Sequence, residues 1–151
     1  MTLDLGIVNP AFCVIDVTEL EETIKLDLVK LEKDNWKVAP YTKIQKLIDE
    51  YNPDEVYVET QGRRSKISGY GIFILGYCLG KNKKFSFVTP ITHGLKIKDY
   101  KERKNYSINL FKENLNTYGL KNKYSKYENK LDDIADAFNM ALREVKLKFD
   151  I

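Results

Sequence analysis

Residues 2–17 read TLDLGIVNPAFCVIDV, in which two apolar runs flank the turn signal Asn9-Pro10. The runs, 2–8 and 11–17, are rich in isoleucine and valine and predict a β-hairpin. Asp4 interrupts the first run. Aspartate is disfavoured in strands, and a buried charge is costly without a compensating partner. Local structure alone therefore explains this residue poorly.

The sequence beyond the hairpin alternates strands and helices. Residues 23–31 alternate apolar and polar side chains, which predicts a third antiparallel strand. A helix over 41–51 separates it from a Val-rich strand over 55–59, and a helix between strands implies a crossover to parallel pairing. Farther along we expect a helix over 66–80, a strand over 85–89, a loop over 119–130, and helices over about 103–116 and 131–146.

This order predicts an α/β fold: a mixed five-stranded sheet, three antiparallel strands followed by two parallel ones, with helices on both faces. The length of 151 residues suits one domain over 1–151 with a proper core. No apolar run is long enough to span a bilayer, and the N-terminus lacks the pattern of a secretory signal. Cys13 and Cys78 lie in apolar contexts, so we expect buried free thiols in a reducing compartment.

Charge is strongly segregated along the chain, although the net charge is only +3. Residues 60–130 carry 16 Lys and Arg against 4 Asp and Glu, whereas 1–59 carry 6 against 13 and 131–151 carry 3 against 5. The basic middle also holds seven of the ten tyrosines. Basic and aromatic side chains together suit nucleic acid, but a solvated lysine-rich surface explains the charge pattern equally well.

Three further acids lie in settings comparable to that of Asp4. Glu59 ends the predicted strand 55–59, and Asp133 and Asp136 are spaced so that both project from one face of the last helix. Taken singly, these are an ordinary strand-end acid and an ordinary helix start, and neighbouring Asp132 is better explained as a capping or dipole acid. Together they favour a site for hard divalent cations, and such a site beside a basic surface favours a nuclease.

In such a site two Mg²⁺ ions about 4 Å apart would be bridged by Asp4 and flanked by the other acids. One ion would activate water for in-line attack on a phosphodiester, and the other would stabilise the leaving oxygen. A lysine from the segment 96–104 is expected near the scissile phosphate, with Lys104 preferred and Lys101 second. His93 is better explained as a loop or packing residue than as a ligand.

The predicted helix 66–80 contains four glycines and is apolar nearly all round. Glycine lowers helix stability, so its repeated use needs a reason. Small residues let another backbone approach closely, which fits either a central buried helix or a helix–helix dimer interface. We favour the dimer interface.

Three motifs resemble the ribonuclease H-like (retroviral integrase) superfamily, and within it the RuvC-type and the poxvirus Holliday junction resolvases, those of avian poxviruses above all. The motifs span nearly the whole chain: Leu3-Asp4-Leu5-Gly6-Ile7-x-Asn9-Pro10-Ala11, Val58-Glu59-x-Gln61-x-Arg63 and Asp133-Ile134-Ala135-Asp136-Ala137. The last resembles the paired-aspartate helix of the family, whose spacing selects Asp133 over Asp132. The start is abrupt, since only three residues precede Asp4, which is compatible with a short missing N-terminal piece.

The resemblance implies a metal-dependent endonuclease that nicks four-way DNA junctions symmetrically as a homodimer, with the Gly-rich helix 66–80 near the dimer interface. It implies Mg²⁺ or Mn²⁺, two ions per active site, bound by Asp4, Glu59, Asp133 and Asp136. It assigns the catalytic lysine to Lys104, less firmly anchored because no motif precedes it. It also implies the resolution of concatemeric viral replication products in the host-cell cytoplasm.

Three other functions remain open on the sequence. The stretch around Asp4 and Asn9 also resembles the first phosphate motif of actin-like and sugar-kinase ATPases, but those proteins need two such domains. A ribonuclease H acting on RNA–DNA hybrids fits the acids nearly as well and needs no dimer. A non-catalytic DNA-binding scaffold of the same fold is the third alternative, and the presence of all four acids argues against it.

Overall fold

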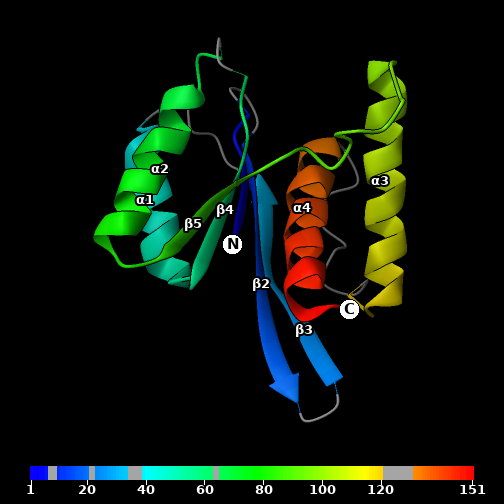
Figure 1. The fold of residues 1–151 in the computed structure, drawn as a ribbon, viewed down its shortest axis with the longest axis horizontal. Helices are drawn as coiled ribbons and strands as arrows, with labels where there is room; N and C mark the ends of the chain where they lie inside the picture. The colour runs from blue at the N-terminus through cyan, green and yellow to red at the C-terminus, as the bar shows by residue number, and fades with distance from the viewer. Residues whose placement is uncertain (7–9, 21–22, 34–38, 63–64, 121–130) are drawn as a thin grey trace.

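The computed structural model describes the chain except for residues 7–9, 21–22, 34–38, 63–64 and 121–130. A single mixed sheet holds the described strands, with two helices on each side of it (Figure 1). The strands are β1 (Thr2–Asp4), β2 (Ala11–Leu20), β3 (Thr23–Lys33), β4 (Glu55–Glu59) and β5 (Lys84–Val88). The helices are α1 (Pro40–Tyr51), α2 (Ser68–Gly80), α3 (Tyr100–Thr117) and α4 (Asp132–Phe149).

The five strands lie in the order β3-β2-β1-β4-β5, which confirms the predicted mixed sheet. β1 is central: it pairs antiparallel with β2 and parallel with β4, and β4 pairs parallel with β5. β1 ends at Asp4, so the strand expected over 2–8 is shorter than predicted. β2 and β3 instead run longer than expected, because antiparallel pairing continues from Ala11↔Lys33 to Leu20↔Thr23. The predicted turn residue Asn9 lies outside the described residues.

Alternation along the strands sends successive side chains to opposite faces of the sheet. On one face, Leu3, Phe12 and Val58 pack with Ile44 of α1 and Ile74 of α2. The other face packs against α4 and α3 through a second buried cluster, which includes Cys13, Leu28, Phe111, Ile134 and Phe138. Cys13 and Cys78 are buried free thiols, as expected. Each face of the sheet is therefore covered by a helical layer.

α4 lies directly on the sheet, and α3 packs on the outside of α4 (Figure 1). α3 begins at Tyr100, three residues earlier than predicted, because Asp99 caps it: its Oδ1 accepts from the backbone N–H of Glu102 at 2.9 Å. α4 extends to Phe149 rather than 146. None of the helices in the described part of the chain is long and apolar enough to cross a membrane.

α2 covers one edge of the sheet and leaves an apolar face uncovered. Gly71, Ile74 and Cys78 are buried, whereas the side chains of Ile72 and Leu79 are 62% and 63% exposed. The alternative of a helix buried on all sides is therefore wrong. A Cβ atom at Gly71 would lie 2.8 Å from the ring of Phe87, so a larger residue there requires this half-exposed ring to move. A Cβ atom at the other helical glycines, Gly69, Gly76 and Gly80, would meet open space.

Candidate active site

The central strands bring the first two acids together at one end of the sheet. The β1–β4 register pairs Leu3 with Val58, and both side chains point into the core beneath α1 and α2. The next residues, Asp4 and Glu59, therefore project from the opposite face, toward α4. A hydrogen bond with Glu59 is among the causes that raise the pKa of Asp4, so the two carboxylates lie within hydrogen-bonding reach of each other.

The surroundings of Asp4 disfavour the ionised form of its carboxyl group. Its pKa lies well above the ordinary range, first because of burial, then because of the hydrogen bond and charge of Glu59 and the charges of Asp136 and Asp133. The four predicted acids are thus close enough to oppose one another's ionisation. A divalent cation would relieve this repulsion.

Asp136 lies beneath α3 and has a neutral partner. Its Oδ1 accepts a hydrogen bond from the Ser107 hydroxyl at 2.5 Å. The pKa of Asp136 is raised to about 6, first by burial and also by the charges of Glu59 and Asp133, against the lowering effect of the hydrogen bond from Ser107. Asp136 therefore combines a raised pKa with a fixed position on α4.

The other two acids of α4 are each paired with a lysine. Lys33, the last residue of β3, donates to Oδ2 of Asp133 at 2.5 Å. Asp132 accepts from Lys104 of α3. Burial alone would raise the pKa of Asp132, but the bond from Lys104 and further interactions hold it below the ordinary range. Asp132 thus lies in the first turn, as expected of a dipole acid, and additionally binds Lys104.

The donor set fits hard divalent cations, since four carboxylates provide the oxygen ligands that Mg²⁺ prefers. The side chains are not closed around one point: in the described part of the chain, no three His, Cys, Asp or Glu residues are grouped so as to hold a metal ion. Asp133 is turned to Lys33, Asp136 to Ser107, and Asp4 to Glu59. The four-carboxylate metal site therefore stays a prediction.

A model of the poxvirus A22 protein family matches residues 1–148. The chain is 34% identical to the Holliday junction resolvase of Fowlpox virus (strain NVSL) over 146 residues, which cover 93% of this chain and 88% of the relative. It is 32% identical to the Holliday junction resolvase of Vaccinia virus (strain Ankara) over 148 residues, covering 97% and 75%. The chain belongs to the poxvirus A22 protein family.

Solved structures agree with this membership. A Fowlpox virus resolvase in complex with substrate Holliday junction DNA matches at a TM-score of 0.82 and 33% identity, covering 97% of this chain and 95% of that one. T. thermophilus RuvC in complex with Holliday junction substrate matches at a TM-score of 0.63 and 15% identity, covering 97% and 93%. The second likeness concerns the fold alone. The ribonuclease H-like, RuvC-like fold expected from the motifs is confirmed.

Among the predicted lysines of this A22 family chain, Lys104 pairs with Asp132, the residue that precedes Asp133. Its bond to Asp132, and then one to Tyr100, raise the pKa of its ammonium above the ordinary value, so it is charged at neutral pH. Its Nζ also lies 4.8 Å from the centre of the Tyr100 ring. Because α3 begins early, Lys104 lies one turn inside the helix rather than at its start. Lys101 is exposed, and His93 is an exposed turn residue, as predicted for a loop.

The sequence did not single out three residues near the acids: Lys33, Ser107 and Asn139. Ser107 follows Lys104 by three residues, and Asn139 follows Asp136 by three, so helical spacing carried a signal once both helices were assigned. Nothing in the sequence indicated that α3 would lie against α4 in this register. Arg63, which belongs to the second motif, lies outside the described residues.

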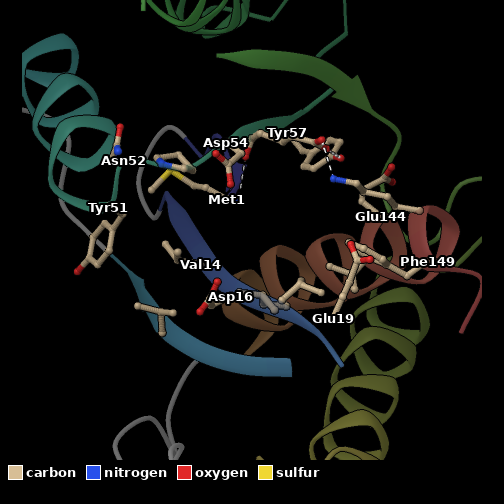
Figure 2. Close-up of a pocket in the computed structure, with 17 residues that line it drawn as sticks. Met1, Val14, Asp16, Glu19, Tyr51, Asn52, Asp54, Tyr57, Glu144 and Phe149 are labelled. Carbon is tan, nitrogen blue, oxygen red and sulfur yellow. Dashed lines mark hydrogen bonds and ion pairs between the residues drawn. The ribbon is translucent and has the colours of Figure 1, made fainter. Parts of the chain in front are cut away.

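A pocket of about 400 Å³ lies toward the beginning of β1 and β4. Figure 2 shows its walls, with Met1 just before β1, Tyr57 from β4, Asp16 from β2 and Glu144 from α4. The four predicted acids do not line it. The acids therefore lie outside this hollow, at the opposite end of the central strands.

Proposed function

We propose that this chain is a Holliday junction resolvase, an endonuclease that hydrolyses phosphodiesters in four-way DNA by paired symmetric nicks. One observation carries the proposal: Asp4 and Glu59 from neighbouring parallel strands lie with Asp133 and Asp136 of α4, close enough to oppose one another's charge. This occurs in a chain of a family whose relatives bear that name. The same four acids are the residues that the sequence motifs select.

The proposed site binds Mg²⁺ or Mn²⁺, two ions, through Asp4, Glu59, Asp133 and Asp136. When bound, the ions lower the pKa of water and stabilise negative charge on the leaving oxygen. The chain itself supplies ligand orientation: Asp4 and Glu59 are fixed by the strand register, and Asp136 is held by Ser107. A bound cation would offset the charge repulsion among these carboxylates.

Lys104 is the proposed catalytic lysine, and Lys101 is its alternative. Its ammonium is charged and half-buried next to Asp132, where it can stabilise negative charge on the scissile phosphate. The bond that Lys104 donates to Asp132 keeps this side chain near the beginning of α4. Exposed Lys96 and Lys98 precede α3 and extend the basic surface that would contact the DNA backbone.

The proposed molecule is a homodimer formed through helix 66–80, because cutting both strands of a two-fold symmetric junction calls for two active sites. α2 offers the apolar side chains of Ile72 and Leu79, with glycines that would admit a second helix closely. A single nuclease domain over 1–151 would act on concatemeric viral replication intermediates in the host-cell cytoplasm.

The test is a cleavage assay with purified protein and Mg²⁺ on three labelled substrates: a four-way DNA junction, linear duplex DNA and an RNA–DNA hybrid. We expect paired symmetric nicks in the junction, lost in Asp136→Asn. Cleavage of the hybrid with an intact junction would assign a ribonuclease H activity instead. Binding of the junction without cleavage in Mg²⁺ or Mn²⁺ would assign the non-catalytic scaffold.

A further inference from the structure

A chain of buried hydrogen bonds connects the interior of the α3–α4 interface to Asp136. Ser107 of α3 and Asn139 of α4 are only 1% and 2% exposed. The Asn139 amide Nδ2 donates to the backbone oxygen of Ser107 at 2.8 Å and to its Oγ at 3.2 Å. The Ser107 hydroxyl in turn donates to Oδ1 of Asp136 at 2.5 Å.

The direction of these bonds follows from the groups themselves. An amide nitrogen only donates, so the Ser107 oxygen must accept from Asn139. A hydroxyl has one hydrogen, which is then left for the Asp136 carboxylate. The orientation of the Asn139 amide is set by Asn114, whose Nδ2 donates to Asn139 Oδ1 at 3.4 Å. The network therefore ends in a hydrogen bond aimed at one oxygen of Asp136.

Asp136 differs in this respect from its neighbours on α4. Lysines pair with Asp132 and Asp133, whereas the partner that the structure gives Asp136 is a neutral hydroxyl. A neutral donor fixes the position of a carboxylate without cancelling its charge. It uses one of the lone-pair sites of the carboxylate and leaves the others to a cation.

We propose that Ser107 and Asn139 are positioning residues that hold the Asp136 carboxylate in the orientation that binds the divalent cation. This rests on the proposed function, because it takes Asp136 as a metal ligand. Asn139 acts through Ser107, and Ser107 acts through Asp136. Hydrogen-bond partners of metal ligands commonly contribute about 10- to 100-fold to metal affinity or activity.

A purely structural role is the competing explanation, since buried hydrogen bonds between α3 and α4 also stabilise the helix pair. The two roles differ in what they change. A structural bond affects the melting temperature, whereas a positioning bond also affects the affinity for metal in the folded protein. Phe111→Leu is the matched control, because Phe111 joins the same two helices by packing edge-on against Phe138 of α4, at 5.1 Å between ring centres.

The experiment is a calorimetric titration of the DNA-free, full-length chain with Mn²⁺, together with its melting temperature. We expect Ser107→Ala to weaken Mn²⁺ binding about tenfold and Ser107→Thr, which keeps the hydroxyl, to bind close to the wild-type value. Asn139→Leu removes the donor and keeps the volume, so the hydroxyl can rotate and the loss should be intermediate. Phe111→Leu should lower the melting temperature without changing Mn²⁺ affinity.

The double variant Ser107→Ala with Asp136→Asn separates the inference from the proposed site. Asp136→Asn alone should weaken Mn²⁺ binding. If adding Ser107→Ala to Asp136→Asn weakens Mn²⁺ binding no further, Ser107 acts through Asp136. Wild-type affinity in a folded Ser107→Ala overturns the inference and leaves the metal site intact. If Ser107→Ala does not fold, unchanged affinity in Asn139→Leu overturns it. If Asp136→Asn binds Mn²⁺ like wild type, the metal site and the inference both fail.

Discussion

Asp4 lies at the end of the central strand β1, where burial and neighbouring acids disfavour its ionised form. Asp4→Asn should abolish cleavage, because the amide cannot replace a carboxylate ligand, while junction binding stays largely intact. In metal-free protein the same change should raise the free energy of unfolding by about 1 kcal/mol, since the amide can donate to Glu59 and carries no buried charge. Cleavage and denaturant unfolding are the measurements.

Asp16→Asn is the control for Asp4→Asn, because Asp16 is an exposed strand aspartate that lies away from the four acids. It should leave cleavage and stability near wild type. Metal-dependent cleavage that persists in Asp4→Asn would show that Asp4 is not a ligand and that the site is assigned wrongly.

Lys104→Ala should slow junction cleavage about 100-fold, because it removes a charge placed to stabilise the phosphate in the transition state. Mn²⁺ binding to the DNA-free variant should be retained, since Lys104 contacts Asp132 rather than a predicted ligand. Single-turnover cleavage measures the effect. Lys101→Ala is the matched control, and a slow Lys101→Ala beside a normal Lys104→Ala would make Lys101 the catalytic lysine.

At the scale of elements, the sequence predicts those site residues that a local pattern within one strand or helix marks. Asp4 and Glu59 stood out because charges end or interrupt apolar strands, and Asp133 and Asp136 because helical spacing puts them on one face. Ser107 and Asn139 did not stand out, because a polar residue within a helix is ordinary until its partner helix is known. α3 begins earlier than its apolar pattern predicts, because the capping bond of Asp99 adds a polar first turn.

One element-scale interaction links the beginning of β4 to the end of α4. Glu55 lines the pocket in Figure 2, where its Oε1 accepts from Lys148 at 2.8 Å and its other oxygen from Tyr57. These bonds, that of Lys148 first, lower the pKa of Glu55 to about 2. A carboxyl whose pKa is lower in the folded state stabilises the fold above its unfolded pKa and loses this contribution as pH falls.

Glu55→Gln should therefore lower the free energy of unfolding at pH 7 by about 1 kcal/mol, a value reduced for solvent screening of partly exposed pairs. Between about pH 5 and pH 2 the wild-type advantage should shrink, because the wild-type carboxyl becomes protonated there. Urea unfolding across this range measures both effects. Glu113→Gln, at an exposed site on α3, should show neither, and an equal loss at every pH would exclude ionisation as the cause.

At the scale of the whole molecule, the four predicted acids and the exposed apolar side chains of α2 lie on different surfaces of the chain. The four acids lie on the side of the sheet that α4 covers, whereas the uncovered side of α2 presents Ile72 and Leu79 on the opposite side of the sheet. Two copies joined through α2 would thus leave both groups of acids uncovered by the interface. This arrangement suits a substrate with two equivalent scissile strands.

Gly76→Ala tests this assembly with effects of opposite sign. A Cβ atom at Gly76 meets open space within one chain, so alanine should stabilise the isolated helix by about 0.5–1 kcal/mol. If α2 packs against α2 of a second copy, the same methyl obstructs close approach and weakens the dimer. Sedimentation velocity over a concentration series should therefore show more monomer, while the melting temperature of the monomer rises.

Asn109→Ala is the control for Gly76→Ala, because Asn109 is exposed on α3 and alanine there favours the helix without touching α2. It should leave the monomer–dimer equilibrium unchanged.

Ile72→Asp should dissociate the dimer further and convert paired nicks into single nicks, since each monomer retains its acids but loses its partner site. A wild-type monomer at all concentrations, with paired nicks unaffected by either α2 variant, would mean that the two cuts do not require this interface.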